Sequence, residues 1–146
     1  MIRTDMPREA AEFLALHNQH AEHPEATQAL VYLNHEGRIT GALAYHHANA
    51  LSCMCDIALE STFPRTLLHA GLWYPFTQLG LRRLTFFIAA DNLRSIALVE
   101  KLGAFREATL QDGCSTGEAY IYCLRPEKCP LWSKFNGKRR LGPTGS

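Results

Sequence analysis

The chain lacks the features that would tie it to a membrane, to a polyanion or to the secretory route. Its 146 residues carry 15 Lys and Arg against 14 Asp and Glu, and the net charge of +1 argues against binding polyanions through overall charge. No run comes near the roughly 18–20 apolar residues of a membrane-spanning helix. Residues 1–5 contain an acid and no apolar segment typical of a secretion signal, so we expect a cytoplasmic protein.

Cysteine and histidine are present without the spacing of a metal site. The five cysteines are an odd number, and no two have the two-residue spacing of a zinc knuckle. Disulfides are not expected in a reducing compartment. We interpret Cys53 and Cys55 as small packed thiols, with a redox or metal role as the alternative if they prove exposed. His17, His20 and His23 recur every three residues, which places each about 60° around a helix from the last, so no shared metal ion is predicted.

The stretch 84–107 is the most informative part of the chain. Both alternating faces of the strand expected over 84–89 are mostly apolar, which is typical of a central strand covered on both sides. Asp91 or Asn92 can cap the helix that follows by accepting a backbone hydrogen bond, and Gly103 can take the left-handed conformation that ends it. One face of this helix is apolar: Ile96, Val99 and Leu102.

The first half of the chain predicts one helix and three strands. Apolar residues at helical spacing indicate a helix over 7–22. Alternating apolar residues then indicate strands over 29–34, 39–47 and 51–59. The connections between these strands are short, and Gly37 can take a positive φ in the first of them. We therefore expect an antiparallel meander.

The connection between strands 51–59 and 84–89 is long enough to hold a helix, which we expect over 65–79. A strand, a helix and a strand in this order form a parallel pair with a right-handed crossover. Pro75 lies inside the helix, where it removes a hydrogen bond and crowds the carbonyl of Gly71, so a kink is expected near it. The fold class is therefore α/β (α+β), with a mixed, mostly antiparallel sheet and flanking helices.

The end of the chain predicts a hairpin and a basic tail. Strands are expected over 104–110 and 119–124, with 111–117 as a polar turn region. We expect one domain over 1–127 and a tail over 128–146, of which about the last ten residues are mobile. The tail could bind nucleic acid or an acidic partner, but its basic residues lack interleaved aromatics and a solvated terminus is the favoured interpretation.

A parallel pair inside an otherwise antiparallel sheet predicts a ligand site. Two parallel strands whose crossover helix lies on one face can separate at their C-terminal ends, where ligands of open α/β sheets bind. A candidate site therefore lies between 56–59 and 89–92. The loop 60–65 leads into the next helix, whose unpaired N–H groups and dipole favour an anion such as a pyrophosphate. Arg65 would add a positive charge there, or is an ordinary solvated arginine.

Three segments within 72–110 carry a resemblance to a known family. They are Tyr74-Pro-Phe76-Thr-Gln-Leu79-Gly80, Asn92-Leu-Arg-Ser95 and Glu100-Lys101-Leu102-Gly103-Ala104-Phe105. The last two resemble the C-terminal half of the GNAT N-acetyltransferase signature. All three are most similar to the branch that acetylates protein N-termini, as on ribosomal proteins. The compact chain also resembles acetyltransferase-like proteins encoded by bacteriophages.

The resemblance implies a GNAT fold and acetyl-CoA as co-substrate. In that family the pantetheine arm pairs with the backbone of the fourth strand, and the pyrophosphate rests on the loop that opens the next helix. The implied residues are Ile57, Ala58 and Leu59 for the arm, Ser61, Thr62, Arg65 and Thr66 for the pyrophosphate, and Asn92 and Ser95 beside the arm. Asn92 could instead serve only as a helix cap.

The chain departs from the family pattern at two points. Residues 60–66 include no glycine, although glycine lets backbone amides approach a phosphate closely, and Glu60 adds a negative charge near the expected phosphates. Many members have a general-acid Tyr seven residues after the Asn, where this chain has Val99. The branch that acetylates N-termini often lacks this Tyr, so activity is not excluded.

The implied chemistry is direct attack of an amine on a thioester. The amine must lose a proton to a base, and backbone N–H groups of the separated strand would polarise the carbonyl. Asp56 is the only acid on the expected strand and is the candidate base, the alternative being a solvated or hydrogen-bonded strand Asp. Tyr120 and Tyr122 could line the acceptor side, with core packing expected for one of them.

The sequence therefore predicts an enzyme that transfers an acetyl group from acetyl-CoA to a primary amine. The acceptor would be a protein N-terminus, a lysine or a small-molecule amine. The alternative is a catalytically inactive protein of the same fold, retained as a binding or phage virion-associated module. The glycine-free segment 60–66 favours the alternative, whereas Asn92, Ser95 and the Lys-Leu-Gly of 101–103 favour the enzyme. Neither a membrane partner nor an oligomeric state is predicted.

Overall fold

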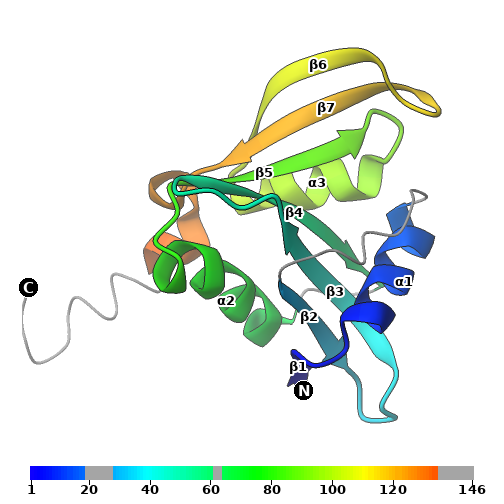
Figure 1. Cartoon of the computed structure of the whole chain (residues 1–146), viewed down its shortest axis with the longest axis vertical. Helices are drawn as coiled ribbons and strands as arrows, with labels where there is room; N and C mark the ends of the chain where they lie inside the picture. Colours follow the sequence, from blue (N-terminus) through cyan, green and yellow to red (C-terminus); the bar gives the residue numbers. More distant parts are fainter. Residues whose placement is uncertain (19–27, 61–63, 135–146) are drawn as a thin grey trace, which may run out of the picture.

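A computed structural model of the chain describes residues 1–18, 28–60 and 64–134 (Figure 1). Its centre is a seven-stranded sheet with the order β1-β2-β3-β4-β5-β7-β6, in which only β4 and β5 are parallel neighbours. The predicted mixed, mostly antiparallel sheet is confirmed. The strands are β1 (Ile2–Arg3), β2 (Gln28–Leu33), β3 (Ile39–His46), β4 (Ser52–Leu59), β5 (Arg83–Ala89), β6 (Phe105–Cys114) and β7 (Gly117–Leu124). The helices are α1 (Pro7–Asn18), α2 (Arg65–Trp73) and α3 (Leu93–Leu102), with a π-helical turn η1 (Tyr74–Gln78) and a 3-10 turn η2 (Pro126–Lys128).

The antiparallel meander predicted for the first half of the chain is confirmed as β2, β3 and β4. In the first turn Gly37 has a φ of +78°, and the side chain of Asn34 accepts hydrogen bonds from the backbone N–H groups of Glu36 and Arg38. Strand β1 was not predicted, because two residues are too few to show alternation. The amino group of Met1 extends this pairing by donating to the carbonyl oxygen of Leu33 at 3.0 Å.

The helices cover the two faces of the sheet unequally. Helix α1 packs on one face of β2, β3 and β4, where small side chains let the helix lie close: Ala10, Ala29, Ala42, Ala44 and Ala58. Helices α2 and α3 share the other face and one large apolar core. Helix α1 begins at Pro7 as predicted and is described as far as Asn18, whereas His20 and His23 lie outside the described residues.

Strand β5 is covered on one face only, which corrects the prediction of a strand covered on both. Leu84, Phe86 and Ile88 are buried in the core beneath α3. On the opposite face Phe87 remains 38% exposed. The physical reason is that the helices packed beside β5 lie on a single face, so the apolar residues of the other face meet no covering layer among the described residues.

Proline changes the end of α2. Pro75 has no N–H to donate to the carbonyl of Gly71, and the buried hydroxyl of Tyr45 donates to that carbonyl instead. The chain continues as the π-helical turn η1, in which the N–H of Leu79 donates to the carbonyl of Tyr74 at 3.0 Å. The kink expected at Pro75 thus corresponds to a change from α-helix to π-helix.

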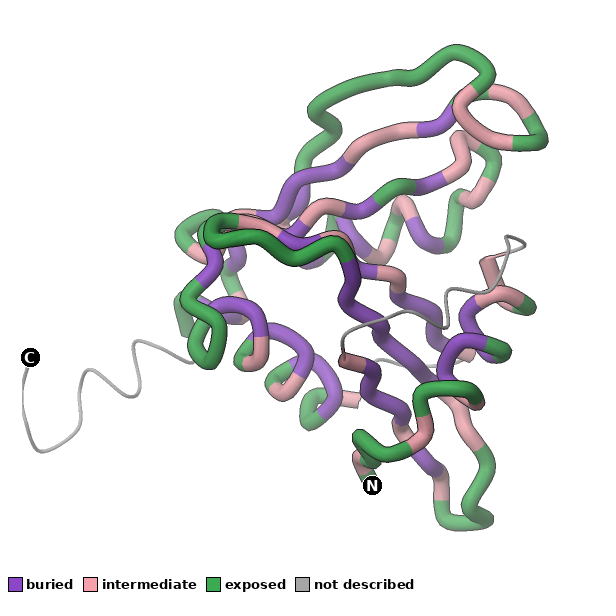
Figure 2. Tube along the Cα trace, in the orientation of Figure 1, coloured by how far each residue is buried: buried purple, intermediate pink, exposed green. Residues whose placement is uncertain are grey.

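The C-terminal hairpin is longer than predicted. Strand β6 runs on to Cys114, so 111–114 belong to the strand and only Ser115 and Thr116 form the turn. Figure 2 shows most of β6 as exposed, because it forms the edge of the sheet. An edge strand tolerates polar residues on both faces, which is why the segment resembles a turn. Strand β7 lies between β5 and β6 and pairs with both.

The core continues beyond η2. Gly103 ends α3 with a φ of 106°, as predicted, and the chain that passes over it after β7 buries Cys129 and Trp132. The ring of Trp132 lies beside that of Phe76, with centroids 6.1 Å apart. None of the described helices is long and apolar enough to cross a membrane. Residues 135–146, the greater part of the expected tail, lie outside the described residues.

Candidate active site

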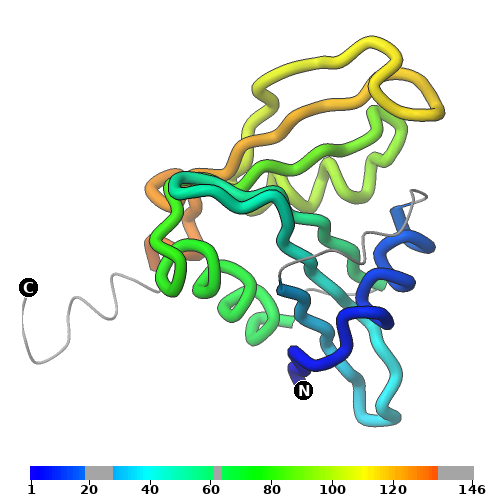
Figure 3. The backbone as a smooth tube through the Cα atoms, in the orientation of Figure 1, coloured from blue at the N-terminus to red at the C-terminus, as the bar shows by residue number. Residues whose placement is uncertain are grey.

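Strands β4 and β5 form a fork. They pair only through Ser52–Arg83, Cys53–Leu84 and Met54–Thr85. Beyond this point β4 stays paired with β3 and β5 stays paired with β7, so the two strands diverge (Figure 3). The separation predicted for the parallel pair is confirmed.

The edge of β4 that faces the fork carries unshared backbone groups. Alternate residues of a strand direct their N–H and C=O groups to opposite edges. The carbonyl of Ile57 points into the fork, because it accepts a hydrogen bond at 3.3 Å from the side-chain amide of Asn18 on α1. By alternation, the backbone N–H and C=O groups of Cys55 and Leu59 also point into the fork. Those of Asp56 and Ala58 point toward β3.

Two cavities lie at the fork and share five lining residues: His17, Asn18, Asn92, Arg94 and Ser95. The larger has a volume of about 630 Å³ and extends to Asp56, to Asp91 and to the tip of the β6–β7 hairpin. The smaller has a volume of about 300 Å³ and lies between the end of β4, at Ala58 and Leu59, and helix α3. The fork is therefore hollow on both sides of a shared centre.

The first turn of α3 forms that centre. The side-chain oxygen of Asn92 accepts a hydrogen bond from the N–H of Ser95 at 3.2 Å, which confirms the cap predicted for this helix. The side-chain oxygen of Asn18 faces the same turn, 3.3 Å from the hydroxyl of Ser95 and 3.5 Å from the amide nitrogen of Asn92. Asn18 thus links α1, β4 and α3 across the fork. No local pattern marks this residue, because its partners lie 39 to 77 positions away.

Asp56 lines the larger cavity and has a buried partner. One carboxylate oxygen lies 3.2 Å from Nε2 of His46, and the side chain of Asp56 is only 12% exposed. Nδ1 of His46 lies 2.6 Å from Nδ1 of His47. His46 was not singled out from the sequence. The signal that could have found it is the β3–β4 register, which sets His46 opposite Met54 and therefore diagonal to Asp56 on the same face.

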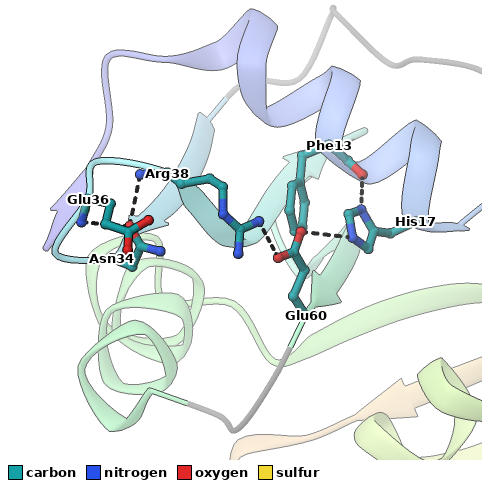
Figure 4. Close-up of polar contacts among 6 residues, drawn as sticks. All are labelled: Phe13, His17, Asn34, Glu36, Arg38 and Glu60. Carbon is teal, nitrogen blue, oxygen red and sulfur yellow. Dashed lines mark hydrogen bonds and ion pairs between the residues drawn. The ribbon is translucent and has the colours of Figure 1, made fainter.

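The negative charge of Glu60 is compensated. Figure 4 shows its carboxylate between Arg38, at 2.6 Å, and Nε2 of His17, at 3.4 Å. The hydrogen bond from Arg38 lowers the pKa of Glu60. The Nδ1 of His17 donates a hydrogen bond to the carbonyl of Phe13. The imidazole also stacks on the aromatic ring of Phe13, with ring centroids 4.0 Å apart. Glu60 is therefore a weaker obstacle to an anion than its charge alone suggests.

The start of α2 was expected to bind a pyrophosphate. Arg65 and Thr66 are exposed in its first turn, outside the linings of both cavities, and the helix follows Pro64. The first N–H groups of a helix have no acceptor within it. Pro64 supplies no side-chain cap to these groups. The predicted residues Ser61 and Thr62 lie outside the described residues.

The two tyrosines of β7 do not line either cavity, which corrects their expected place on the acceptor side. Tyr122 is buried in the core, and burial together with its hydrogen bond to Glu100 raises its pKa to about 12. The ring of Tyr120 lies 4.3 Å below the guanidinium of Arg106. Both positions alternate with Ile121 and so face α3 and its surroundings rather than the fork.

Comparison with known proteins finds solved structures with the same arrangement of strands and helices. No protein-family model matches the chain, and no curated protein matches its sequence. Solved structures do match. The spermidine N-acetyltransferase from Vibrio cholerae in complex with CoA and spermine has a TM-score of 0.67 at 17% identity, over 88% of this chain and 96% of that one. The dodecameric form of the same Vibrio cholerae enzyme in an intermediate state has a TM-score of 0.66 at 17% identity, over 92% and 95% of the two chains.

The chain has the GNAT fold. At 17% identity the likeness concerns the arrangement of the elements, and the chemistry must be argued from this chain's own residues. The fork of its GNAT fold suits a ligand that contains amides. The side-chain amide of Asn18 already donates to the carbonyl of Ile57, so the edge of β4 accepts an amide N–H in the geometry shown.

Proposed function

We propose that the chain is an N-acetyltransferase that takes an acetyl group from acetyl-CoA and transfers it to a primary amine. The observation that carries the proposal is the hollow fork, with a cavity on each side and shared polar residues, Asn18, Asn92 and Ser95, at its centre. Such a site can hold a long carrier on one side and an acceptor on the other.

The smaller cavity and the edge of β4 would hold the carrier. Backbone groups of Ile57 and Leu59 would pair with the amides of its arm, with Ala58, Asn92 and Ser95 alongside. The helix start at Arg65 and Thr66, together with Ser61 and Thr62, would meet the pyrophosphate through backbone N–H groups and one guanidinium. Acetyl-CoA itself supplies the activated acetyl group.

The larger cavity would hold the acceptor. Asp56 and Asp91 place two carboxylates in its lining, which suits an amine that arrives protonated. Asp91 is oriented by a hydrogen bond of 3.2 Å from the hydroxyl of Thr116 at the hairpin tip. Asp56 would take the proton that the amine must lose before it attacks. The solved relative that binds spermine supports an amine acceptor, and a protein N-terminus, a lysine or a polyamine remains within the proposal.

The same proposal includes the compartment and the extent of the domain. Four of the five cysteines, Cys53, Cys55, Cys123 and Cys129, are free and buried, which supports a reducing, cytosolic environment. We propose one catalytic domain over residues 1–127 with a basic tail behind it.

A second candidate is a binding protein that has kept the fold without catalysis. Two observations favour it: residues 60–66 include no glycine, and the amide of Asn18 occupies the edge of β4 that the carrier would use.

Two measurements decide between these functions. Calorimetric titration with acetyl-CoA should show one site per chain, and binding should raise the melting temperature. Release of free thiol should then be followed with spermidine, with a lysine peptide blocked at its N-terminus, and with a lysine-free peptide carrying a free N-terminus. Binding together with turnover of at least one acceptor supports the enzyme. No binding at saturating acetyl-CoA would exclude it.

A further inference from the structure

His46 is a buried titratable side chain without a role in the proposed site. It lies near the end of β3, is 4% exposed and does not line either cavity. Its Nε2 lies 3.2 Å from the carboxylate of Asp56, which does line the larger cavity. A buried imidazole beside a cavity-lining carboxylate is placed to exchange a proton with it.

Asp56, His46 and His47 form a series of contacts that leads from the cavity to the surface. Asp56 lines the larger cavity, His46 lies behind it, and His47 is exposed at the start of the turn after β3. The distances are 3.2 Å between Asp56 and Nε2 of His46, and 2.6 Å between the two Nδ1 atoms. No group of three or more His, Cys, Asp and Glu among the described residues has the arrangement of a metal site, so ligation of a metal ion does not explain this cluster.

The short contact between two Nδ1 atoms restricts the protonation of both rings. Two unprotonated nitrogens would repel at 2.6 Å, so one of them carries a proton that the other accepts. The contact between Nε2 of His46 and Asp56 gains a proton in the same way when Asp56 takes one up. Each contact in this series can therefore pass one proton to the next group.

We propose that Asp56, His46 and His47 form a proton relay that carries the amine proton of the acceptor from the larger cavity to solvent. This rests on the proposed function. Asp56 accepts the proton as the amine nitrogen bonds to the acetyl carbon and the carbon–sulfur bond breaks, and CoA leaves as a thiolate that takes a proton from water. The proton on Asp56 then passes to Nε2 of His46, whose own proton is on Nδ1. The resulting imidazolium gives its Nδ1 proton to Nδ1 of His47, which releases its Nε2 proton to water. One proton enters from the amine and one leaves to water, and Asp56 is again a carboxylate. Both imidazoles end in the other tautomer, with the proton of His46 on Nε2 and that of His47 on Nδ1, so both exchange tautomers before the next turnover.

Other titratable groups lie near Asp56, His46 and His47 but are not hydrogen-bonded to His46 in the described contacts. His17 of α1 and Asp91 after β5 line the same cavity but are engaged by Glu60 and by Thr116, respectively. Cys55 also lines the cavity, but it alternates with Asp56 and its thiol is buried in the core on the opposite face of β4. Asp56 and His47 are therefore the titratable groups that the described hydrogen bonds place against His46.

The decisive variant keeps the hydrogen bond to Asp56 and removes the relay. His46→Gln can place an amide N–H where Nε2 was and so hold Asp56, yet an amide does not carry protons. We expect kcat to fall at least tenfold and its pH profile to change, while the Kd for acetyl-CoA stays within twofold of wild type. If His46→Gln keeps the kcat and pH profile of wild type, His46 only orients Asp56 and the relay is refuted.

The surface end of the relay offers a test that does not disturb the core. His47 has a φ of 54°, a conformation that Asn tolerates, so His47→Asn should fold normally. Its kcat should fall severalfold and recover when imidazole is added, because a solute can replace an exposed carrier. His35→Asn, in the exposed turn between β2 and β3, is the matched control. Its kcat should equal that of wild type and should not rise when imidazole is added. A loss in His47→Asn that imidazole does not restore would contradict the relay.

Histidine ring signals in a nuclear magnetic resonance titration give a readout without turnover. In the free protein the rings of His46 and His47 should shift together with pH, and Asp56→Asn should move both. Independent titration of the two rings would refute the relay, whatever the activity. No turnover by wild type with any amine would instead refute the proposed function, and the relay with it.

Discussion

The side-chain amide of Asn18 donates a hydrogen bond to the carbonyl oxygen of Ile57 at 3.3 Å, across a gap that the two strands of the fork leave open. Its own oxygen faces Ser95 at 3.3 Å. One primary amide therefore donates to the edge of β4 at the place where the proposed carrier would bind. This relationship joins the end of α1 to β4 and α3, and it puts the first helix at the centre of the proposed site.

Replacing Asn18 should change affinity and stability in opposite directions. If acetyl-CoA must displace this amide, Asn18→Ala should bind it about two- to tenfold more tightly, because a net hydrogen bond contributes roughly 0.5–1.5 kcal/mol. The melting temperature should fall by a few degrees. Calorimetry and thermal unfolding measure the two effects. Asn49→Ala, which removes comparable hydrogen bonds in the turn before β4, should lower stability alone. Weaker binding in Asn18→Ala would show that Asn18 assists the carrier.

Asn92 has two separable roles, and two variants distinguish them. Asn92→Ala removes the cap on Ser95 and should cost about 0.5–2 kcal/mol of stability as well as affinity for acetyl-CoA. Asn92→Ser keeps an oxygen at the cap and should restore most of the stability while affinity stays low, because the amide nitrogen is gone. Urea unfolding and calorimetry separate these quantities. Full binding by Asn92→Ser would limit the residue to capping.

Features of the site that depend on neighbouring residues could be predicted from the sequence, whereas contacts between distant elements could not. The fork follows from local features, namely a crossover helix between two strands and polar residues after β5, and these are visible in 84–92. Asp56 was named as the only acid on its strand, Asn92 as a helix cap and through the family resemblance, and Ser95 through the resemblance alone. Asn18 and His46 were missed because their partners come from other elements, Ile57 and Asp56, and the contacts depend on how α1 and β3 dock.

The errors in the fold have the same origin. The sequence shows that Phe87 is apolar, but only the assembled layers show that no described helix covers its face. Residues 111–114 are polar because β6 is an edge strand, and the position of a strand within a sheet is a tertiary property. Alternation, caps and the pairing of consecutive strands were predicted correctly, whereas the exposure of Phe87 and the edge position of β6 were not.

Glu60 should link stability to pH at the acid end. Its pKa is lowered in the folded protein by Arg38, so the ionised form is favoured on folding. This contribution is present above the unfolded pKa of about 4.3 and is lost as pH falls through the folded pKa. Glu60→Gln should therefore lower the melting temperature at neutral pH and match wild type below about pH 3. Glu36→Gln, in the exposed turn beside Arg38, is the control and should follow wild type throughout. A difference that persists in strong acid would contradict this account.

The hydroxyl of Tyr45 and the ring of Pro75 should be energetically coupled through the carbonyl of Gly71. In wild type the proline leaves this carbonyl without a helical donor and Tyr45 supplies one. Tyr45→Phe leaves a buried acceptor unsatisfied and should cost about 1–3 kcal/mol in urea unfolding. Pro75→Ala restores an N–H that can reach the same carbonyl, so Tyr45→Phe should cost clearly less in the Pro75→Ala background. Strict additivity in this double-mutant cycle would show that the two groups do not share the carbonyl.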